Sequence, residues 1–226
     1  MAYFLVVSSD YERVTCALYK NTEQIDQRSD HKHNISKNLI VLLDSLLTTH
    51  TLSLSDMDFI AVNKGPGPFT TLRTVIASVN GISFATHVPL IGINGLTALV
   101  KEHASTDGPI TVALLNAFNK DVYFAIASND QDIQTGYENI ERLLTNLKTQ
   151  FAEKEIRFIG SGVQLYDAEI KNIMGARAYV PKDYPLHASV GQIARIALEK
   201  WHAEDLSYQL QPLYVKEQKF KKARTY

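Results

Sequence analysis

The chain has 226 residues, enough for one large domain or two small lobes. Hydrophobic residues make up 45% of it and charged residues 21%, which is typical of a folded globular protein and excludes a disordered one. With a formal net charge of -1, nothing in the overall charge requires a nucleic acid or an acidic surface as partner.

The single cysteine, Cys16, excludes an internal disulfide and offers no cysteine pair for a metal. It falls in an apolar run at 14–18 that is typical of a strand, so we expect a buried structural thiol. The N-terminus lacks the basic start and the length of a secretory signal, and no stretch forms a clean membrane span. We therefore expect a cytoplasmic protein that contacts no membrane.

The first half of the chain alternates short β-type runs with two helical segments. Short runs rich in β-branched and aromatic residues predict strands, and apolar residues at helical spacing predict helices. In chain order these are strands at 5–7, 14–19 and 24–28, a helix with its body at 39–47 that begins near Asn34 or Ser36, a strand at 59–62, a helix at 70–86 and a strand at 89–93.

The second half repeats this order with weaker signals. It predicts strands at 110–115 and 122–127 joined by a turn at 119–121, a helix at 138–151, a strand at 156–159 and a final helix at 189–201. Two copies of a strand–strand–strand–helix–strand–helix unit predict a two-lobed α/β fold. We assign residues 1–106 to the first lobe, 107–206 to the second lobe and 207–226 to a C-terminal tail.

The most informative stretch is also the least charged. From Thr74 to Val100 the chain has 27 residues and no Asp, Glu, Lys or Arg. Asn, His, Pro and Gly residues interrupt the stretch, which argues against a membrane span. A soluble helix at 70–86 must therefore hide more than one face.

At 3.6 residues per turn, this helix separates two surfaces. One carries large apolar residues suited to packing on a sheet: Leu72, Val75, Ile76, Val79 and Ile82. The opposite surface carries small uncharged residues: Thr74, Ala77, Ser78, Gly81 and Ala85. Small residues let a second helix approach closely, and glycine inside a helix costs about 1 kcal/mol relative to alanine, so Gly81 indicates a packing role. We interpret the small-residue surface as an interface for a partner subunit.

The preceding helix gives a weaker indication of the same kind. Its apolar residues spread over roughly 160°, which is wider than the roughly 100° needed to face one core. We therefore include four of its leucines in the predicted partner interface: Leu39, Leu43, Leu46 and Leu47. The alternative is that both helices pack against other parts of this same chain.

A glycine–proline loop at 63–73 joins a predicted strand to the helix at 70–86. Its glycines permit unusual backbone conformations, its prolines stiffen it, and Thr70 or Thr71 can cap the helix. A helix N-terminus attracts anions, which makes five residues candidate anion or nucleotide contacts: Lys64, Gly65, Gly67, Thr70 and Arg73. The loop is neither a P-loop nor a dinucleotide fingerprint, and a rigid strand-to-helix turn is the simpler interpretation.

Residues 65–73 read Gly-Pro-Gly-Pro-Phe-Thr-Thr-Leu-Arg. They resemble the Gly-Pro-Gly-Ser-Phe-Thr-Gly-Leu-Arg signature of the TsaB (YeaZ) family, and the layout of nearly the whole chain is similar too. That layout has an opening three-strand unit, a leucine-rich helix and a late Pro-Leu-Tyr-Val-Lys segment at 212–216. The chain thus resembles a divergent member of this family, with the loop as the specific part of the match.

The resemblance implies a two-lobed, actin-like (ASKHA, ribonuclease H-like) fold related to sugar kinases and heat-shock ATPases. Members of the family pair through first-lobe helices with a paralogous catalytic subunit, TsaD, and act with the small ATPase TsaE. The assembly transfers a threonylcarbamoyl group from its adenylate to a tRNA adenosine beside the anticodon. The resemblance therefore implies an accessory subunit with no cofactor of its own, because the complex handles ATP and threonylcarbamoyl-adenylate, and with only indirect contact to tRNA.

Departures from the family pattern bear on ligand binding. Pro68 and Thr71 replace the usual serine and glycine of the loop, and Ser8-Ser9 follows the first strand where Asp-Thr is usual. Residues 116–123 resemble the family's Asp-Ala-Arg segment but lack that acid and that arginine. We therefore expect complex assembly to be retained more readily than any ligand contact.

An actin-like ATPase needs a carboxylate near the end of its first strand, to hold metal-bound phosphates and position water. Ser8 and Ser9 cannot supply that charge, and Asp10 follows them in a predicted turn. His31 and His33 have no evident third metal ligand, and no nucleophile constellation is evident. We expect neither catalytic residues nor a metal site.

The last eleven residues form a basic end that either contacts tRNA phosphates or stays solvated. Its cations are Lys216, Lys219, Lys221, Lys222 and Arg224.

Three function classes stay open for the chain as a whole. It is a subunit that activates a TsaD-like enzyme, an actin-like enzyme that acts on a nucleotide or sugar, or a homodimeric protein that self-associates through the same helices.

Overall fold

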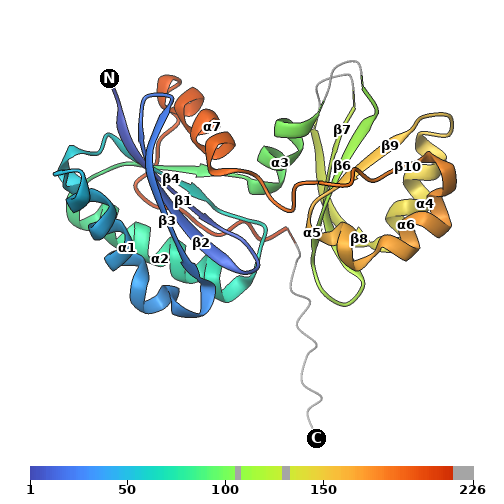
Figure 1. Cartoon of the computed structure of the whole chain (residues 1–226), viewed down its shortest axis with the longest axis horizontal. Coiled ribbons are helices and arrows are strands. Elements are labelled where there is room, and N and C mark those ends of the chain that lie inside the picture. Colours follow the sequence, from blue (N-terminus) through green and yellow to red (C-terminus); the bar gives the residue numbers. More distant parts are fainter. Residues whose placement is uncertain (105–107, 129–132, 216–226) are drawn as a thin grey trace, which may run out of the picture.

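The structure is a computed structural model that describes residues 1–104, 108–128 and 133–215. It contains two five-stranded mixed sheets, one in each lobe (Figure 1). The strand order of the first sheet is β3 (Glu23–His31), β2 (Arg13–Lys20), β1 (Tyr3–Ser9), β4 (Phe59–Asn63) and β5 (Leu90–Ile93). That of the second is β10 (Ala178–Tyr179), β9 (Ile156–Ile159), β6 (Ile110–Asn116), β7 (Asp121–Ala127) and β8 (Ile133–Asn139).

The two sheets have the same pattern of strand pairing. In each, three consecutive strands pair antiparallel, and the first of them also pairs in parallel with the strand that follows the next helix. The helices are α1 (Ile35–Thr49), α2 (Phe69–Thr86), α3 (Gly95–His103), α4 (Ile140–Gln150), α5 (Ser161–Leu165), α6 (Asp167–Met174) and α7 (Val190–His202), with short 3-10 turns at η1 (Lys32–Asn34), η2 (Leu54–Asp56) and η3 (Gly175–Arg177). The predicted duplicated unit is therefore confirmed.

Helices and sheets form five layers, in which the order is α1 and α2, the first sheet, α3 and α7, the second sheet, and α4 and α6 (Figure 1). Central strands are covered on both faces, so they read as continuous apolar runs. In β1, Leu5 and Val7 contact the core under α1 and α2, whereas Phe4 and Val6 face the layer of α3 and α7. One hydrophobic cluster thus joins the two lobes.

The two middle helices are exchanged between the lobes. Helix α3 follows the first sheet in sequence but packs on strands β6, β7 and β8 of the second. Helix α7 follows the second sheet but packs on strands β1, β4 and β5 of the first, where the Trp201 ring stacks on Phe59 at 5.1 Å between centroids. Our assignment of 107–206 to the second lobe therefore misplaces α7, because its apolar face covers the first sheet.

Several elements were not predicted. Helix α3 begins at Asn94, whose side-chain oxygen accepts hydrogen bonds from the backbone N–H groups of Leu96 and Thr97. Strand β8 was not predicted, because it is largely polar, and the predicted helix at 138–151 overlaps its last two residues. The short elements α5, α6 and β10 follow β9, in a stretch to which the sequence analysis assigned no element.

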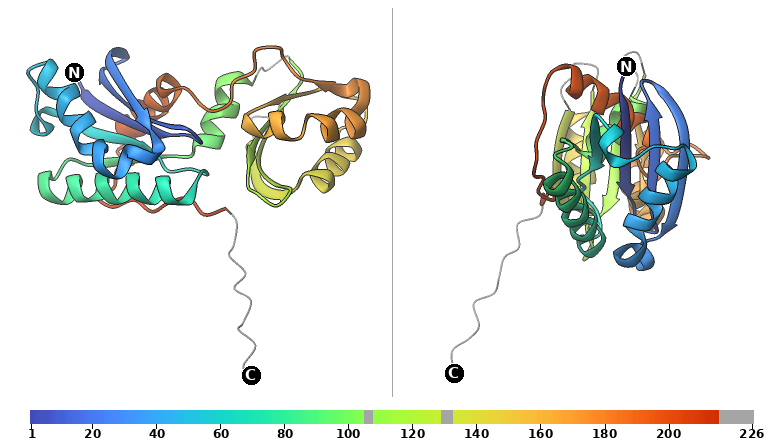
Figure 2. Two further views of the ribbon diagram at one scale, coloured as in Figure 1. Left: turned by 60° about the horizontal axis from the view of Figure 1, so that its bottom comes forward. Right: turned by 90° about the vertical axis from the view of Figure 1, so that its left-hand side faces the viewer.

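The segment that follows α7 returns along α2 (Figure 2, left). Ser207 pairs with Leu90 at the edge of the first sheet, and the Leu213 N–H donates to the Lys64 carbonyl. Between these points the Asn80 amide exchanges two hydrogen bonds of 2.9 Å with the backbone of Leu210. Residues 207–215, which we call the strap, are therefore fixed to the fold, and the basic end at 216–226 lies outside the described residues.

Among the helices that the structure describes, none combines the length and the apolarity needed to cross a bilayer. Helix α2 is long enough, but it belongs to the folded first lobe, where its large side chains pack on the sheet.

Asn80→Ala should destabilise the chain by about 1–3 kcal/mol, because it leaves the backbone N–H and C=O of Leu210 without their partners in a partly buried place. Urea unfolding followed by circular dichroism measures this loss. Asn146→Ala, at an exposed position of α4, is the matched control and should change the free energy of unfolding by less than about 0.5 kcal/mol. Equal losses in the two variants would contradict the role of the strap.

Cys16 should react with a thiol reagent only when the chain unfolds. Burial raises the pKa of the Cys16 thiol to about 12, so the folded thiol stays protonated and covered at pH 8. Colorimetric thiol titration should give slow labelling in buffer and fast labelling in unfolding urea. Because the thiol of the unfolded chain ionises near its ordinary value of 9.0, its contribution to stability should be full below that pH and fall as the pH rises towards 12.

Candidate functional site

The outer face of α2 carries small and uncharged side chains into solvent. Ala77, Gly81 and Ala85 are exposed, while Thr74 and Ser78 are half-buried. A Cβ atom built at Gly81 would meet nothing within 4 Å, so no part of the described chain covers this face at Gly81. The large-residue face lies in the core, as predicted, with its five members at most 9% exposed.

Phe84 is the residue of this face that the sequence analysis missed. Its side chain is 85% exposed, although phenylalanine is usually buried. It lies seven positions after Ala77, which places the two on the same side of the helix. That spacing was the signal that could have identified it. We call Thr74, Ala77, Ser78, Gly81, Phe84 and Ala85 the α2 outer face.

The four leucines that we assigned to the partner interface are not on the surface. Leu39, Leu43, Leu46 and Leu47 are at most 3% exposed, in the core between α1, α2 and the first sheet. The wide apolar arc of α1 arises because that helix packs against α2 as well as against the sheet. The apolar residues that α1 exposes are Ile40 and Val41, at 52% and 62%.

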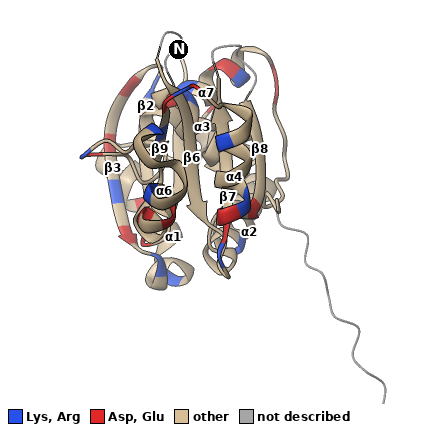
Figure 3. Cartoon of the chain, turned by 90° about the vertical axis from the view of Figure 1, so that its right-hand side faces the viewer, with Lys and Arg blue, Asp and Glu red and all other residues tan. Residues whose placement is uncertain are grey.

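Charge distinguishes the α2 outer face from the helices of the second lobe. Helices α4 and α6, which cover the far side of the second sheet, carry both basic and acidic residues (Figure 3). In α2, Arg73 is the only formally charged residue, and it lies in the first turn. Solvent-facing helices normally carry charged side chains, so the α2 outer face is unusual within this molecule.

The glycine–proline loop is a rigid turn. The Asn63 side chain accepts a hydrogen bond from the Gly65 N–H at 3.0 Å and donates to the Ser8 hydroxyl at 3.2 Å. Gly65 has φ +103°, and a Cβ there would lie 2.8 Å from a Leu72 methyl carbon, so this position favours glycine on both counts. Helix α2 begins at Phe69 with Pro68 as its N-cap, so the expected capping by Thr70 or Thr71 is wrong.

The five candidate anion contacts do not converge on one point. The Lys64 stem lies over Gly92 next to the Leu210 side chain of the strap. The Lys64 charge also helps Lys200 to hold the pKa of Asp205 below its ordinary value. The Arg73 guanidinium donates to the Tyr214 hydroxyl at 2.9 Å and lies over the rings of Tyr214 and Phe69. Gly65 and Gly67 shape the turn, and of the five only Thr70 lines the neighbouring cleft.

Asp10 follows the first strand and lines a cleft of about 370 Å³ together with residues of the second lobe such as Asn116 and His187. Ser8 is buried, and the Asp10 carboxylate closes its own turn by accepting hydrogen bonds from the N–H groups of Glu12 and Arg13 at 2.6 and 2.7 Å. The His187 side chain contacts the other Asp10 oxygen at 3.4 Å. Both Asp10 oxygens therefore have partners within the described chain.

Tyr11 links the two lobes at this point by a hydrogen bond. Its hydroxyl donates to the Asn116 carbonyl at 2.6 Å, and burial raises the pKa of Tyr11. Asn116 begins the turn in which Phe118, Asn119 and Lys120 all have positive φ, a backbone strain that is uncommon in consecutive residues other than glycine. The first-strand turn and this second-lobe turn are thus tied together directly.

The histidine pair does not form a metal site. His31 ends β3, and His33 lies in the 3-10 turn η1, so the two do not share a strand face. Within the described residues, no group of three or more His, Cys, Asp or Glu side chains could hold a metal ion.

Tyr11→Phe should lower the free energy of unfolding by about 0.5–1.5 kcal/mol, because it removes one hydrogen bond that joins the lobes and leaves the Asn116 carbonyl without that donor. Thermal unfolding followed by circular dichroism measures the loss. Tyr208→Phe, at a ring that is 62% exposed, is the control and should have almost no effect. A loss no larger than that of the control would show that the lobes are held together without this bond.

Comparison with known proteins identifies the family. A family model described as "TsaD: tRNA N6-adenosine threonylcarbamoyltransferase" matches residues 28–225. The tRNA threonylcarbamoyladenosine biosynthesis protein TsaB of Haemophilus influenzae is 28% identical over 127 residues, which cover 54% of this chain and 52% of that protein. In that match the chain spans about half the length of the curated relative. TsaB of Buchnera aphidicola subsp. Acyrthosiphon pisum is 20% identical over 214 residues, 92% of this chain and 93% of that protein.

A solved structure has the same fold. YeaZ from Pseudomonas aeruginosa superposes with a TM-score of 0.70 at 20% sequence identity, covering 95% of this chain and all of that one. This likeness and the duplicated unit confirm the two-lobed, actin-like α/β fold. The chain belongs to the family that the threonylcarbamoyltransferase model describes, and within it to the TsaB (YeaZ) group.

Proposed function

We propose that this chain is a non-catalytic subunit of the complex that makes N6-threonylcarbamoyladenosine in tRNA, and that it binds a TsaD-like catalytic subunit through the α2 outer face. The observation that carries the proposal is the exposure of Ala77, Gly81 and Phe84 on a helix face without formal charge. Water solvates such an uncharged face only weakly, so the face is suited to packing against a second helix.

The energetics favour a helix as the partner element. Burying the Phe84 side chain against a partner would contribute about 1.5–3 kcal/mol by its apolar area. Gly81 and Ala77 place no bulky side chains in the way, so a second backbone can approach to short interaxial distances. Ile40 and Val41 on α1 extend the exposed apolar surface.

The family match supports the choice of partner. The chain itself fits the model of the transferase family along residues 28–225, so a TsaD-like subunit is expected to have the same duplicated fold. Two related chains with corresponding first-lobe helices can pair about a pseudo-twofold axis. A TsaE-like ATPase, ATP and threonylcarbamoyl-adenylate would then belong to the assembled complex, and tRNA would reach this chain only through it.

The absence of catalysis in this chain is also part of the proposal. Its support is the Asp10 carboxylate, which lines the cleft between the lobes but accepts hydrogen bonds within its own turn. A nucleotide-consuming actin-like enzyme would need that carboxylate and that space for metal-bound phosphate. ATP turnover by the purified chain would contradict this part.

A second candidate uses the same surface. The α2 outer face could pair with a second copy of this chain, because a twofold axis through Gly81 would bring identical small faces together. Size-exclusion chromatography after co-expression with the TsaD-like protein separates the two. A heterodimer supports the first proposal, whereas a homodimer that ignores the transferase supports the second.

Gly81→Arg should abolish pairing with the TsaD-like subunit, because a charged side chain would enter the space needed by the partner helix. Co-purification of the two chains from one cell measures the pairing. The variant should fold, since glycine is the less favourable residue inside a helix and a Cβ meets nothing at this position.

Two controls make this test specific. Ala168→Arg adds the same charge at a small exposed residue of α6 in the second lobe and should leave pairing intact. Gly81→Ala should raise the free energy of unfolding by about 0.5–1 kcal/mol. Pairing that survives Gly81→Arg as well as it survives Ala168→Arg would rule out the α2 outer face as the interface.

A further inference from the structure

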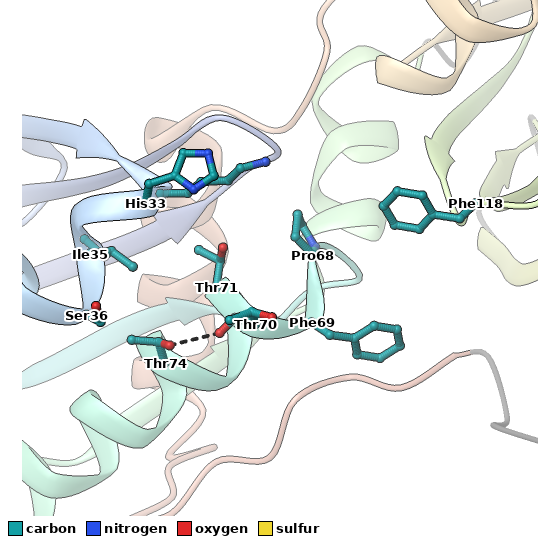
Figure 4. A pocket seen from close by; sticks show the side chains of 10 residues that line it. His33, Ile35, Ser36, Pro68, Phe69, Thr70, Thr71, Thr74 and Phe118 are labelled. Carbon is teal, nitrogen blue, oxygen red and sulfur yellow. Dashed lines mark hydrogen bonds between the residues drawn. The ribbon is translucent and has the colours of Figure 1, made fainter. Parts of the chain in front are cut away.

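A cleft lies beside the first turn of α2, on the side away from Lys64. Its volume is about 540 Å³, within the usual range for small-molecule sites. Three parts of the chain form it: the start of α2, the η1 turn with the start of α1, and Phe118 from the strained second-lobe turn (Figure 4). The cleft shares only Thr74 with the α2 outer face that we assign to the partner, and Tyr11 does not line it.

The first turn of α2 supplies backbone donors to this cleft. The first N–H groups of a helix have no carbonyl partner within the helix, and the N-cap residue Pro68 has no side-chain acceptor for them. The α2 helix has 18 residues, so its dipole adds a partial positive charge at this end. These groups alone would not define a site, because every helix start has them.

Thr71 provides an independent indication of a ligand. The residue is 5% exposed, yet its side chain lines the cleft, and Figure 4 shows its hydroxyl directed into the space below His33. No hydrogen bond partner of that hydroxyl exists among the residues that the structure describes. The hydroxyl oxygen is open to the cleft although the rest of the residue is buried, so a ligand there can form the hydrogen bond that the described residues do not supply.

The charges around the cleft select an anion. Lys32 and His33 line it, together with the hydroxyl groups of Ser36 and Thr70, and none of its described lining residues is acidic. The Lys32 ammonium donates to the Tyr11 carbonyl, which fixes this positive charge at the wall of the cleft. Backbone N–H groups, hydroxyls and a fixed cation are the donors with which proteins bind phosphate groups.

The opposite wall is aromatic. Phe118 is 56% exposed and faces the start of α2 across the cleft (Figure 4). Its positive φ of 61° shows that the second-lobe turn holds it in a conformation that an isolated chain would avoid. A ring held in this way offers a flat apolar surface for the body of a ligand whose charged end lies on α2.

We propose that this cleft binds a small phosphate monoester, with the phosphoryl group on the α2 N-terminus, Thr71 and His33, and a planar body against Phe118. The site needs residues of this chain alone and does not rest on the proposed partner. Thr71 occupies the position where the resembling signature has glycine, so its hydroxyl contact is a property of this chain rather than of the signature.

Inorganic phosphate and phenyl phosphate are the probes, titrated into the full-length, 15N-labelled chain and followed by amide chemical shifts. We expect millimolar binding with the largest shifts at Phe69, Thr70 and Thr71. Thr71→Val should weaken phosphate binding roughly tenfold, the loss expected for one hydrogen bond to a charged group, and Thr71→Ser should restore it. His33→Glu, at an exposed position, should weaken binding without affecting the fold.

Thr145→Val is the matched control, because Thr145 is an exposed helical threonine on α4, far from the cleft. Phenyl phosphate should bind more tightly than phosphate, and Phe118→Ala should remove that difference. Binding that is undetectable at millimolar phosphate, or equal in wild type, Thr71→Val and His33→Glu, would overturn the site. Equal affinity for the two probes would overturn the aromatic part of the proposal.

Discussion

The structure depends on the packing of one side of α2 against the first sheet, which leaves the opposite side of the helix exposed. One side places Val75, Val79 and their neighbours in the core of the first lobe, and the other side exposes small residues with no formal charge. A helix of this composition is stable because the core of the first lobe covers its large apolar side chains. The exposed side of the helix contributes little to the free energy of folding. The proposed function follows from that exposed side, since a surface of this kind is stabilised when another helix covers it.

The rest of the fold holds this helix rigidly. The strap is hydrogen-bonded to Asn80 on one flank of α2, and the hydrogen bonds of Asn63 fix the turn that precedes α2. The exchanged helices α3 and α7 join both lobes in one core. The contact between Tyr11 and Asn116 adds a polar link between the lobes. A rigid face loses little conformational entropy on association, which favours specific pairing.

Much of the fold could be predicted because its elements have strong local signals. The continuous apolar runs of β1 and β4 and the two-faced pattern of α2 follow from burial on one or both sides. The exchange of α3 and α7 could not be predicted, because an apolar helix face does not indicate which of two apolar sheets it covers. The interface leucines were misplaced for a related reason: the apolar arc of α1 is wide because α2 lies beside it.

The site was predicted in part. Ala77, Gly81 and Ala85 of α2 are exposed as the periodicity indicated, whereas Thr74 and Ser78 are half-buried. Lys64 and Arg73 contact the strap, a contact between distant parts of the chain. Phe118 and Thr71 come together only through the tertiary fold. Side chains within one helix are therefore placed well by sequence, whereas those that meet across lobes are not.

Hydroxyl-radical footprinting of Phe84 tests the central claim most directly. The ring is 85% exposed in the chain alone, so it should be oxidised readily. In the complex with the TsaD-like subunit, oxidation of Phe84 should fall sharply, while that of Tyr179, which is 45% exposed in the second lobe, should stay the same. Undiminished oxidation of Phe84 in a stable complex would contradict the account.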